Sequence, residues 1–282
     1  MIYHLLYNFV DQFSVLNVTK YITFRAMISL LTALAISFIF SPWFISKLRK
    51  KHLGQIIRDE GPKRHKDKTG TPTMGGGLIV FAVALTALLW MDWSNHYLWC
   101  MLFVLLGYAI LGFIDDYRKI SKKNTVGISA KAKLFWQTMI AFCVCLYSYL
   151  YLDNSGIIHI PFLKDVFISV GALYIPFGIF VIVGTSNAVN LTDGLDGLAI
   201  GPVMTTASCY MILSYISGHA VIADYLQLTF VPYTGELAII AAAMTGAGLG
   251  FLWYNTYPAQ VFMGDVGSLS LGGALGALAI FS

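Results

Sequence analysis

Long runs of apolar residues most strongly limit what this chain can fold into. Several stretches of about twenty residues carry no charged side chain, which is long enough for a helix to cross about 30 Å of hydrocarbon. Charged residues make up 11% of the sequence, whereas a soluble domain carries about 25%. Inside a bilayer every backbone polar group needs an internal partner, which a helix provides. The sequence therefore predicts one integral membrane domain over 1–282, an all-α, polytopic transmembrane helical bundle.

Eight membrane spans are predicted from the apolar runs, at about 22–45, 75–91, 97–114, 134–152, 166–186, 198–216, 237–254 and 267–282. The eighth run is short for a complete crossing. Polar residues interrupt the first eighteen positions, so we expect an amphipathic helix at the outer interface over about 1–18 rather than a signal peptide.

The basic residues indicate which loops face the cytoplasm. Of 18 Lys and Arg residues, nine lie between Lys47 and Lys68 and six between Arg118 and Lys133. Because both clusters sit in loops between apolar spans, the positive-inside rule applies to them, and we do not interpret them as nucleic-acid patches. Both termini are then outside, and four loops face the cytoplasm: 46–74, 115–133, 187–197 and 255–266.

Three of these loops bring five aspartates at or near helix ends to the same side of the membrane: Asp115, Asp116, Asp193, Asp196 and Asp265. Adjacent carboxylates such as Asp115 and Asp116 repel each other, and a cation relieves that repulsion. Mg²⁺ prefers hard oxygen ligands and commonly bridges one or two carboxylates and substrate phosphates. The alternative is a solvated helix end, with Arg118 and Lys119 as counter-charges.

Two further loops carry local patterns that favour binding. The loop 187–197 interleaves asparagines, aspartates and glycines, which suits recognition of a base, a ribose or a diphosphate. Asp265 lies between glycines at a helix start, where its alternative role is an N-cap worth about 1 kcal/mol. Phe262 either stacks on a base or anchors its loop at the interface. Together the patterns indicate a magnesium-assisted reaction between a nucleoside diphosphate compound and a membrane lipid.

Two basic segments are candidate phosphate sites. The segment 66–77 leads from lysines into a Gly-rich helix start, and helix N-termini attract phosphates. It has neither a Walker A ending nor dinucleotide-fingerprint spacing, so by itself it is a weak signal. The lysines of the second basic loop either steer an anionic substrate or hold anionic lipid.

Four runs closely resemble a known family, in order and at natural spacing: Gly70-Thr71-Pro72-Thr73-Met74-Gly75-Gly76, Asp115-Asp116-Tyr117, the run 190–199 from Asn190 to Ala199, and the run 258–268. The family is the phospho-N-acetylmuramoyl-pentapeptide transferases, and the resemblance covers essentially the whole chain. It implies transfer of phospho-MurNAc-pentapeptide from UDP-MurNAc-pentapeptide to undecaprenyl phosphate, giving lipid I and UMP in peptidoglycan synthesis, with Mg²⁺. It also implies a multi-pass protein of the bacterial inner membrane whose active site faces the cytoplasm, and it is compatible with a homodimer.

By matching motif, the resemblance assigns roles to individual residues. It implies that Asp265 is the Mg²⁺ ligand and a catalytic residue, with Asp115 and Asp116 as further catalytic residues beside it. It implies nucleotide contacts for one group: Asn190, Asp193, Gly194, Asp196, Asn255 and Phe262. It implies phosphate or sugar-peptide contacts for another: Lys68, Thr73, Lys119, Lys123 and Lys131.

The chain departs from the family pattern at its C-terminal end. The family continues to a loop with three consecutive histidines and to ten spans, whereas the six histidines of this chain include no such run. We therefore expect a truncated chain that is inactive or poorly folded. Two alternative functions are a transferase of N-acetylglucosamine-1-phosphate to the same lipid and, from another class, a cation-coupled transporter. A transporter would place its charged site near the middle of the membrane rather than at helix ends.

Overall fold

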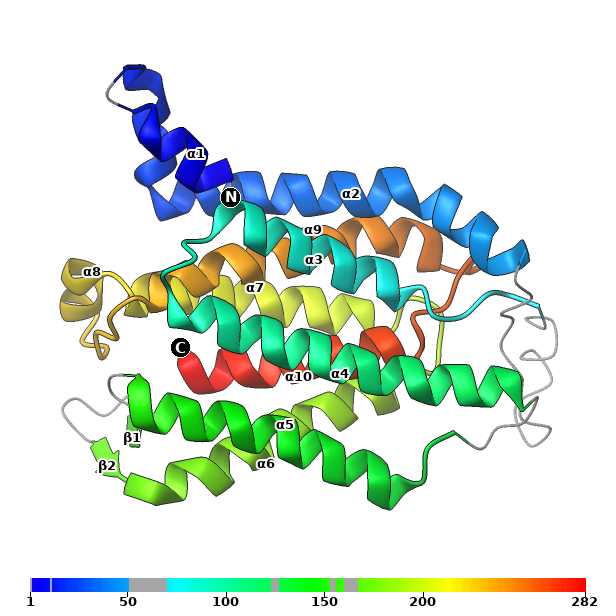
Figure 1. Cartoon of the computed structure of the whole chain (residues 1–282). Helices are drawn as coiled ribbons and strands as arrows, with labels where there is room; N and C mark the ends of the chain where they lie inside the picture. The colour runs from blue at the N-terminus through cyan, green and yellow to red at the C-terminus, as the bar shows by residue number, and fades with distance from the viewer. Residues whose placement is uncertain (1, 11, 51–69, 123–126, 153–155, 160–166) are drawn as a thin grey trace.

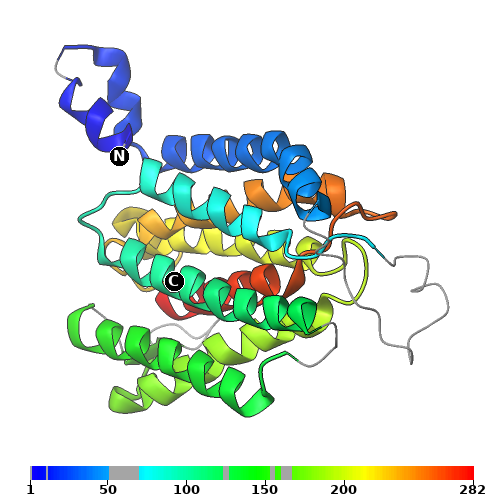
Figure 2. The ribbon, with the colours of Figure 1, turned by 45° about the vertical axis from the view of Figure 1, so that its right-hand side comes forward.

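The protein is a bundle of long helices that run roughly along one direction (Figures 1 and 2). The computed structural model describes residues 2–10, 12–50, 70–122, 127–152, 156–159 and 167–282. Within these ranges, six helices are long and apolar enough to cross a membrane. The prediction of an all-α, multi-pass membrane protein is confirmed.

Helices occupy all eight predicted span positions: α2 (Ile22–Lys50), α3 (Gly76–Trp90), α4 (His96–Ser121), α5 (Ala130–Tyr151), α6 (Tyr174–Thr192), α7 (Ile200–Ser217), α9 (Leu237–Asn255) and α10 (Gly264–Phe281). Of the eight, α3 is shorter than the six candidate spans, and α7 is not among those six. Three helices continue several residues past the predicted ends of their spans, and α2 does so as far as Lys50. The helix α4 continues through Ser121 and α6 through Thr192, because their polar ends find partners on neighbouring helices and need not unwind into loops.

The remaining described elements are short: α1 (Ile2–Asn8), η1 (Ser14–Lys20), β1 (Ile157–His159), β2 (Phe167–Ser169), η3 (Gly171–Leu173), α8 (Ala220–Tyr225) and η4 (Thr234–Glu236). The strands β1 and β2 form an antiparallel hairpin between α5 and α6 that the sequence did not predict. The helix expected over 1–18 is divided between α1 and η1, and its place at the membrane interface stays a prediction.

The helices α9 and α10 form the centre of the bundle, and most of their side chains are buried. Small residues let neighbouring helices approach closely. A Cβ atom added at Gly246 would lie 2.1 Å from the carbonyl oxygen of Leu30 on α2, and one at Gly272 would lie 2.7 Å from Cα of Ser186 on α6. Membrane helices without a hydrophobic driving force between them commonly pack through small residues in this way.

A buried ion pair holds the end of the bundle where both chain termini lie (Figure 1). Arg25 of α2 is 3% exposed, and its Nη1 donates to Oε2 of Glu236 at 2.8 Å. Its Nη2 donates to the other carboxylate oxygen, and Nη1 also reaches the carbonyl oxygen of Trp90 at 3.3 Å. One guanidinium therefore joins the starts of α2 and α9 to the end of α3.

Removing one member of this pair is expected to destabilise the bundle. In Glu236→Leu the guanidinium of Arg25 stays buried without its counter-charge, and a loss of about 3–5 kcal/mol in the free energy of unfolding is expected. Denaturant unfolding in detergent measures it. The double variant Arg25→Met/Glu236→Leu removes both charges and is expected to lose less than Glu236→Leu alone. A double variant that is less stable than both single variants would contradict this explanation.

Candidate functional site

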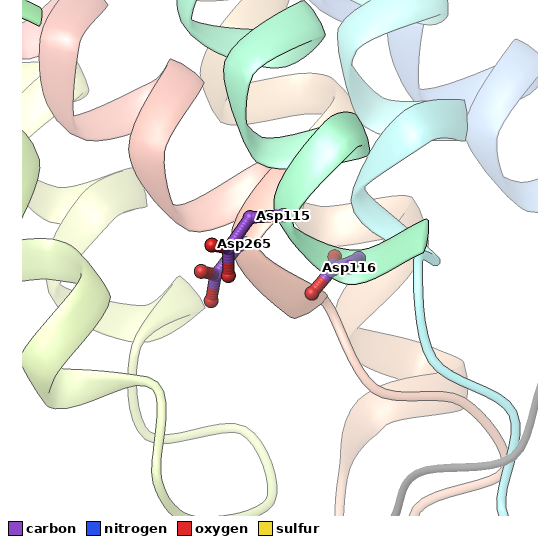
Figure 3. A group of neighbouring side chains, drawn as sticks. All are labelled: Asp115, Asp116 and Asp265. Atoms are coloured by element: carbon purple, nitrogen blue, oxygen red, sulfur yellow. The ribbon is translucent and has the colours of Figure 1, made fainter. Parts of the chain in front are cut away.

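Three carboxylates meet at the opposite end of the bundle from Arg25. One oxygen of each of Asp115, Asp116 and Asp265 lies within 4.8 Å of the others. Asp115 and Asp116 belong to the last two turns of α4, and Asp265 belongs to the first turn of α10 (Figure 3). All three are largely removed from water, since Asp115 is 3% and Asp116 5% exposed. The predicted convergence of these aspartates at one end of the helices is therefore present in the structure.

Asp265 is the centre of this cluster and has polar partners on three other helices. Its Oδ2 lies 2.8 Å from Nζ of Lys133 on α5 and 3.1 Å from Nζ of Lys119 on α4. Its Oδ1 accepts a hydrogen bond of 2.9 Å from Nδ2 of Asn190 on α6. Asn190 also donates to the hydroxyl of Ser268, one turn further along α10. Four helices thus fix the position of one carboxylate.

Asp116 supports the start of α10. Its Oδ2 accepts a hydrogen bond of 3.3 Å from the backbone N–H of Val266, so it partners one of the N–H groups that a helix start leaves without an internal acceptor. The carboxyl group of Asp116 also lies at the positive end of the helix dipole, which favours its ionised form. Gly264 makes the approach possible, because it has a φ of 73° and a Cβ there would lie 2.6 Å from Asp116 Oδ2 and 2.9 Å from Thr73 Oγ1.

Asp115 binds the segment 127–128, directly before α5. Its Oδ1 accepts a hydrogen bond of 2.7 Å from the backbone N–H of Ile128, and its Oδ2 lies 2.5 Å from Nζ of Lys119. A Cβ at Gly127 would lie 2.3 Å from the same carboxylate. Lys119 therefore bridges Asp115 and Asp265, and Asp115 ties the segment before α5 to the acidic cluster.

Asp193, directly after α6, adds a fourth carboxylate to this region. Burial is the main cause that raises the pKa of Asp193 to about 7; the charge of nearby Asp265 acts in the same direction, and a hydrogen bond from the backbone of Gly264 acts in the opposite direction. A carboxyl group with such a pKa is sensitive to any cation that enters the cluster, because a positive charge lowers the pKa.

The donor set of the cluster fits a divalent metal ion. The three grouped carboxylates offer hard oxygen ligands at close range, which is the chemistry that Mg²⁺ prefers. With Asp193 there are four carboxyl groups in this region and two lysines, Lys119 and Lys133, so acidic side chains outnumber ammonium groups in the described part of the site. A divalent cation would favour the ionised form of these carboxyl groups. Asp115, Asp116 and Asp265 are the residues that would hold it.

The run 70–76 is joined to the start of α10 by backbone hydrogen bonds. The N–H of Phe262 donates to the carbonyl of Pro72, and the N–H groups of Gly75 and Gly76 donate to the carbonyls of Phe262 and Met263, each at 2.8 Å. A side chain at Gly76 would meet the backbone of Gly267. The Thr-Pro-Thr-Met-Gly-Gly run therefore holds the segment that carries Asp265, and it places Thr73 beside the cluster.

Asp196 and Asn255 join two loops at this end of the bundle. Oδ2 of Asp196 accepts from the backbone N–H of Ala259 at 3.1 Å, and Oδ1 of Asn255 accepts from the N–H of Gly197 at 3.1 Å. Nδ2 of the buried Asn255 donates to the carbonyl of Val261. These hydrogen bonds hold the loop 193–199 against the loop 256–263, which carries the half-buried Phe262. Gly194 lies exposed on the first of these loops.

Not every predicted contact residue joins this cluster. Lys68 and Lys123 lie outside the described residues, and Lys131 is exposed at the start of α5. The neighbouring Lys133 contacts Asp265 instead, although it was not among the predicted site residues. A signal for it existed: Lys133 and Gln137 are four residues apart on an apolar helix, and Gln137 is 1% exposed. Polar side chains on one face of a membrane helix usually point into the bundle.

Comparison with known proteins adds independent information. Residues 98–282 match the family model described as glycosyl transferase family 4. The phospho-N-acetylmuramoyl-pentapeptide-transferase of Citrifermentans bemidjiense is 51% identical over 282 residues, covering 100% of this chain and 79% of the relative. The protein of the same name from Thermodesulfovibrio yellowstonii is 53% identical, and the match covers 100% of this chain and 79% of that relative. The one from Syntrophus aciditrophicus is 52% identical, and the match covers 99% of this chain and 78% of that relative.

Proposed function

This chain belongs to the phospho-N-acetylmuramoyl-pentapeptide-transferase family, within the glycosyl transferase family 4, and from that membership we propose that it transfers phospho-MurNAc-pentapeptide from UDP-MurNAc-pentapeptide to undecaprenyl phosphate. The products are lipid I and UMP. The observation that carries the proposal is the cluster of Asp115, Asp116 and Asp265 with two lysines at one end of an apolar bundle. A site at this end of the bundle would be accessible both to a lipid phosphate at the membrane surface and to a nucleotide in the aqueous phase.

The reaction requires one phosphorus–oxygen bond to form and one to break. An oxygen of the lipid phosphate attacks the sugar-linked phosphorus of the UDP group, the bond to the bridging oxygen breaks, and UMP leaves with that oxygen. A lipid phosphate is largely ionised near neutral pH, so positioning and charge stabilisation matter more than a general base. Lys119 and Lys133 supply fixed positive charge at the site, and Asp116 keeps the positive end of α10 directed toward it.

Mg²⁺ is proposed as the cofactor, held by Asp265 with Asp115 and Asp116. A bound Mg²⁺ would screen the phosphate charges and orient the reacting oxygens. Asn190 orients the Asp265 carboxylate through its amide, and Ser268 in turn accepts from Asn190. These two side chains act as positioning residues for that carboxylate.

The loops 193–199 and 256–263 are proposed to bind the nucleotide. Asp193, Gly194 and Phe262 would contact it directly, with exposed Gly194 giving a base or ribose close access to the backbone. Asp196 and Asn255 would act through the hydrogen bonds that hold the two loops together. We also propose that this end of the bundle faces the cytoplasm of a bacterial inner membrane, where UDP-activated donors occur, and that the protein can form a homodimer.

The proposed function is tested by UMP release from UDP-MurNAc-pentapeptide with undecaprenyl phosphate, using full-length protein in detergent with Mg²⁺. Release is expected to require both substrates and to stop when EDTA is added. Turnover with UDP-N-acetylglucosamine instead would favour the related N-acetylglucosamine-1-phosphate transferase. A transporter is disfavoured because Asp115, Asp116 and Asp265 lie in the end turns of α4 and α10. Cation uptake into vesicles without UMP release would reinstate it.

A further inference from the structure

A buried polar layer lies one helical turn deeper in the bundle than Asp265 and its partners. It contains Gln137 of α5, Ser186 and Asn187 of α6 and the backbone carbonyl of Leu269 of α10. Nδ2 of Asn187 donates to Oε1 of Gln137 at 3.0 Å, and Nε2 of Gln137 donates to Oγ of Ser186 at 3.4 Å. The hydroxyl of Ser186 donates to the carbonyl of Leu269 at 2.9 Å. One amide on α5 is therefore connected to α6 and, through α6, to α10.

The polar layer repeats the arrangement around Asp265 on the same three helices. Each of its positions is separated by four residues from a residue of the Asp265 site, and residues four apart lie on the same face of a helix. The three pairs are Lys133 and Gln137 on α5, Asn190 and Ser186 on α6, and Asp265 and Leu269 on α10. A shift of α5 or α6 that broke the polar layer would therefore also move Lys133 or Asn190 relative to Asp265.

Gln137 is 1% exposed on a helix whose adjacent side chains face outward. The three residues before it, Leu134, Phe135 and Trp136, are each more than half exposed. Its backbone carbonyl accepts a hydrogen bond of 2.9 Å from the hydroxyl of Tyr108, so α4 also holds this position. Hydrogen bonds between membrane helices contribute little to stability on average, whereas a satisfied buried polar network fixes one arrangement of its members. The amide of Gln137 is thus suited to setting the positions of helices.

We propose that Gln137 is a positioning residue for the acidic cluster: by joining α5 to α6 it holds Lys133 and Asn190 within reach of the Asp265 carboxylate. Lys133 approaches Oδ2 of Asp265 at 2.8 Å and Asn190 approaches Oδ1 at 2.9 Å, so movement of either helix would reorient the carboxylate. The inference rests on the proposed function, which it deepens by adding a residue that acts through other side chains rather than on a substrate.

Gln137→Met tests this role, because it keeps an unbranched side chain of similar length and removes both amide hydrogen bonds. It is expected to weaken Mn²⁺ binding, followed by electron paramagnetic resonance, and to lower kcat for UMP release, each by roughly three- to tenfold. Loss of a direct partner of a metal ligand typically costs about 10–100-fold, and Gln137 acts one step further away. Thermal unfolding in detergent is expected to change little, since the hydrogen bond from Tyr108 reaches the backbone and is kept.

Tyr174→Phe is the matched control. The hydroxyl of Tyr174 on α6 pairs with that of Ser148 on α5 at 2.9 Å, and both residues are buried. This contact also joins α5 to α6, but at the ends of the two helices away from Asp265. Its loss is expected to leave Mn²⁺ binding and kcat unchanged. An equal loss of both in Tyr174→Phe would show that any weakening between α5 and α6 has this effect and would overturn the inference.

Asn187→Leu tests the same contact from α6 and decides the question in the same way if Gln137→Met does not fold. Because both variants remove one shared hydrogen bond, the double variant is expected to lose no more Mn²⁺ affinity than Gln137→Met alone, and additive losses would contradict the shared role. Unchanged Mn²⁺ binding and kcat in folded Gln137→Met would overturn the inference and leave the proposed function intact. Weaker Mn²⁺ binding in Gln137→Met, where even the unaltered protein releases no UMP, would support the positioning role and refute the proposed transfer.

Discussion

Replacing Asp265 with Asn is expected to lower the rate of UMP release by roughly 10²–10³-fold or more, the range seen when one preorganised electrostatic contact is lost. The amide keeps the size of the side chain but removes the negative charge that Lys119 and Lys133 contact at 3.1 and 2.8 Å. It also removes one of the three carboxylates proposed to hold Mg²⁺. Activity over a Mg²⁺ titration, together with Mn²⁺ binding followed by electron paramagnetic resonance, measures both losses.

Asp224→Asn is the matched control for this variant. Asp224 is an exposed carboxylate on α8, at the end of the bundle away from the cluster (Figure 1). Its replacement is expected to leave UMP release and Mn²⁺ binding unchanged. If Asp265→Asn retains most of the activity of the unaltered protein, the assignment of Asp265 to the metal is wrong.

Gly112→Ala is expected to damage both stability and activity, because α4 and α10 cross in direct backbone contact there. An added Cβ would lie 2.2 Å from the carbonyl oxygen of Asp265 and 2.6 Å from the N–H nitrogen of Val266. Overpacking of this kind costs about 1–3 kcal/mol, and two helix backbones have little freedom to yield, so the upper end is expected. The shift also moves Asp265 away from Asp115, and a displacement of about 1 Å can lower a rate roughly 100-fold.

Thermal unfolding in detergent and UMP release measure the two effects separately. Gly184→Ala provides the control, since it is also a helix glycine but has open space around its added Cβ. It is expected to keep or slightly raise stability, because Ala is favoured over Gly in a helix by about 1 kcal/mol. Equal stability of Gly112→Ala and Gly184→Ala would show that the α4–α10 contact tolerates more space than the structure indicates.

The elements that were predicted correctly depend on local sequence. Each apolar run is long enough to form a helix that pairs its backbone groups internally, so eight helices could be predicted from the apolar runs. The basic clusters Lys47–Lys68 and Arg118–Lys133 then predict that every second loop faces the cytoplasm and that the loops between them face the other side of the membrane. Because Asp115, Asp116 and Asp265 border the same set of loops, their shared end of the bundle could also be predicted.

The contacts that the sequence did not reveal join residues far apart in the chain. Lys133 and Lys131 are both lysines near the start of α5, but they lie on different sides of the helix. Lys133 contacts Asp265, which is 132 residues away in the sequence. Asp196 and Asn255 stay predicted nucleotide contacts, and their side chains also accept hydrogen bonds that join two loops, which the sequence did not indicate. Local sequence patterns show that such residues are polar, but they do not show which distant residues they contact.

By itself, the sequence determined that this chain forms a bundle of membrane helices with its aspartates at one end, since apolar length and charge position act locally. Only the tertiary structure decided how those aspartates are used. Close packing of α4 against α10 at Gly112 brings Asp116 to the start of α10 and sets Asp265 between two lysines. Helix crossing, unlike helix formation, is decided by contacts between residues that are distant in the sequence.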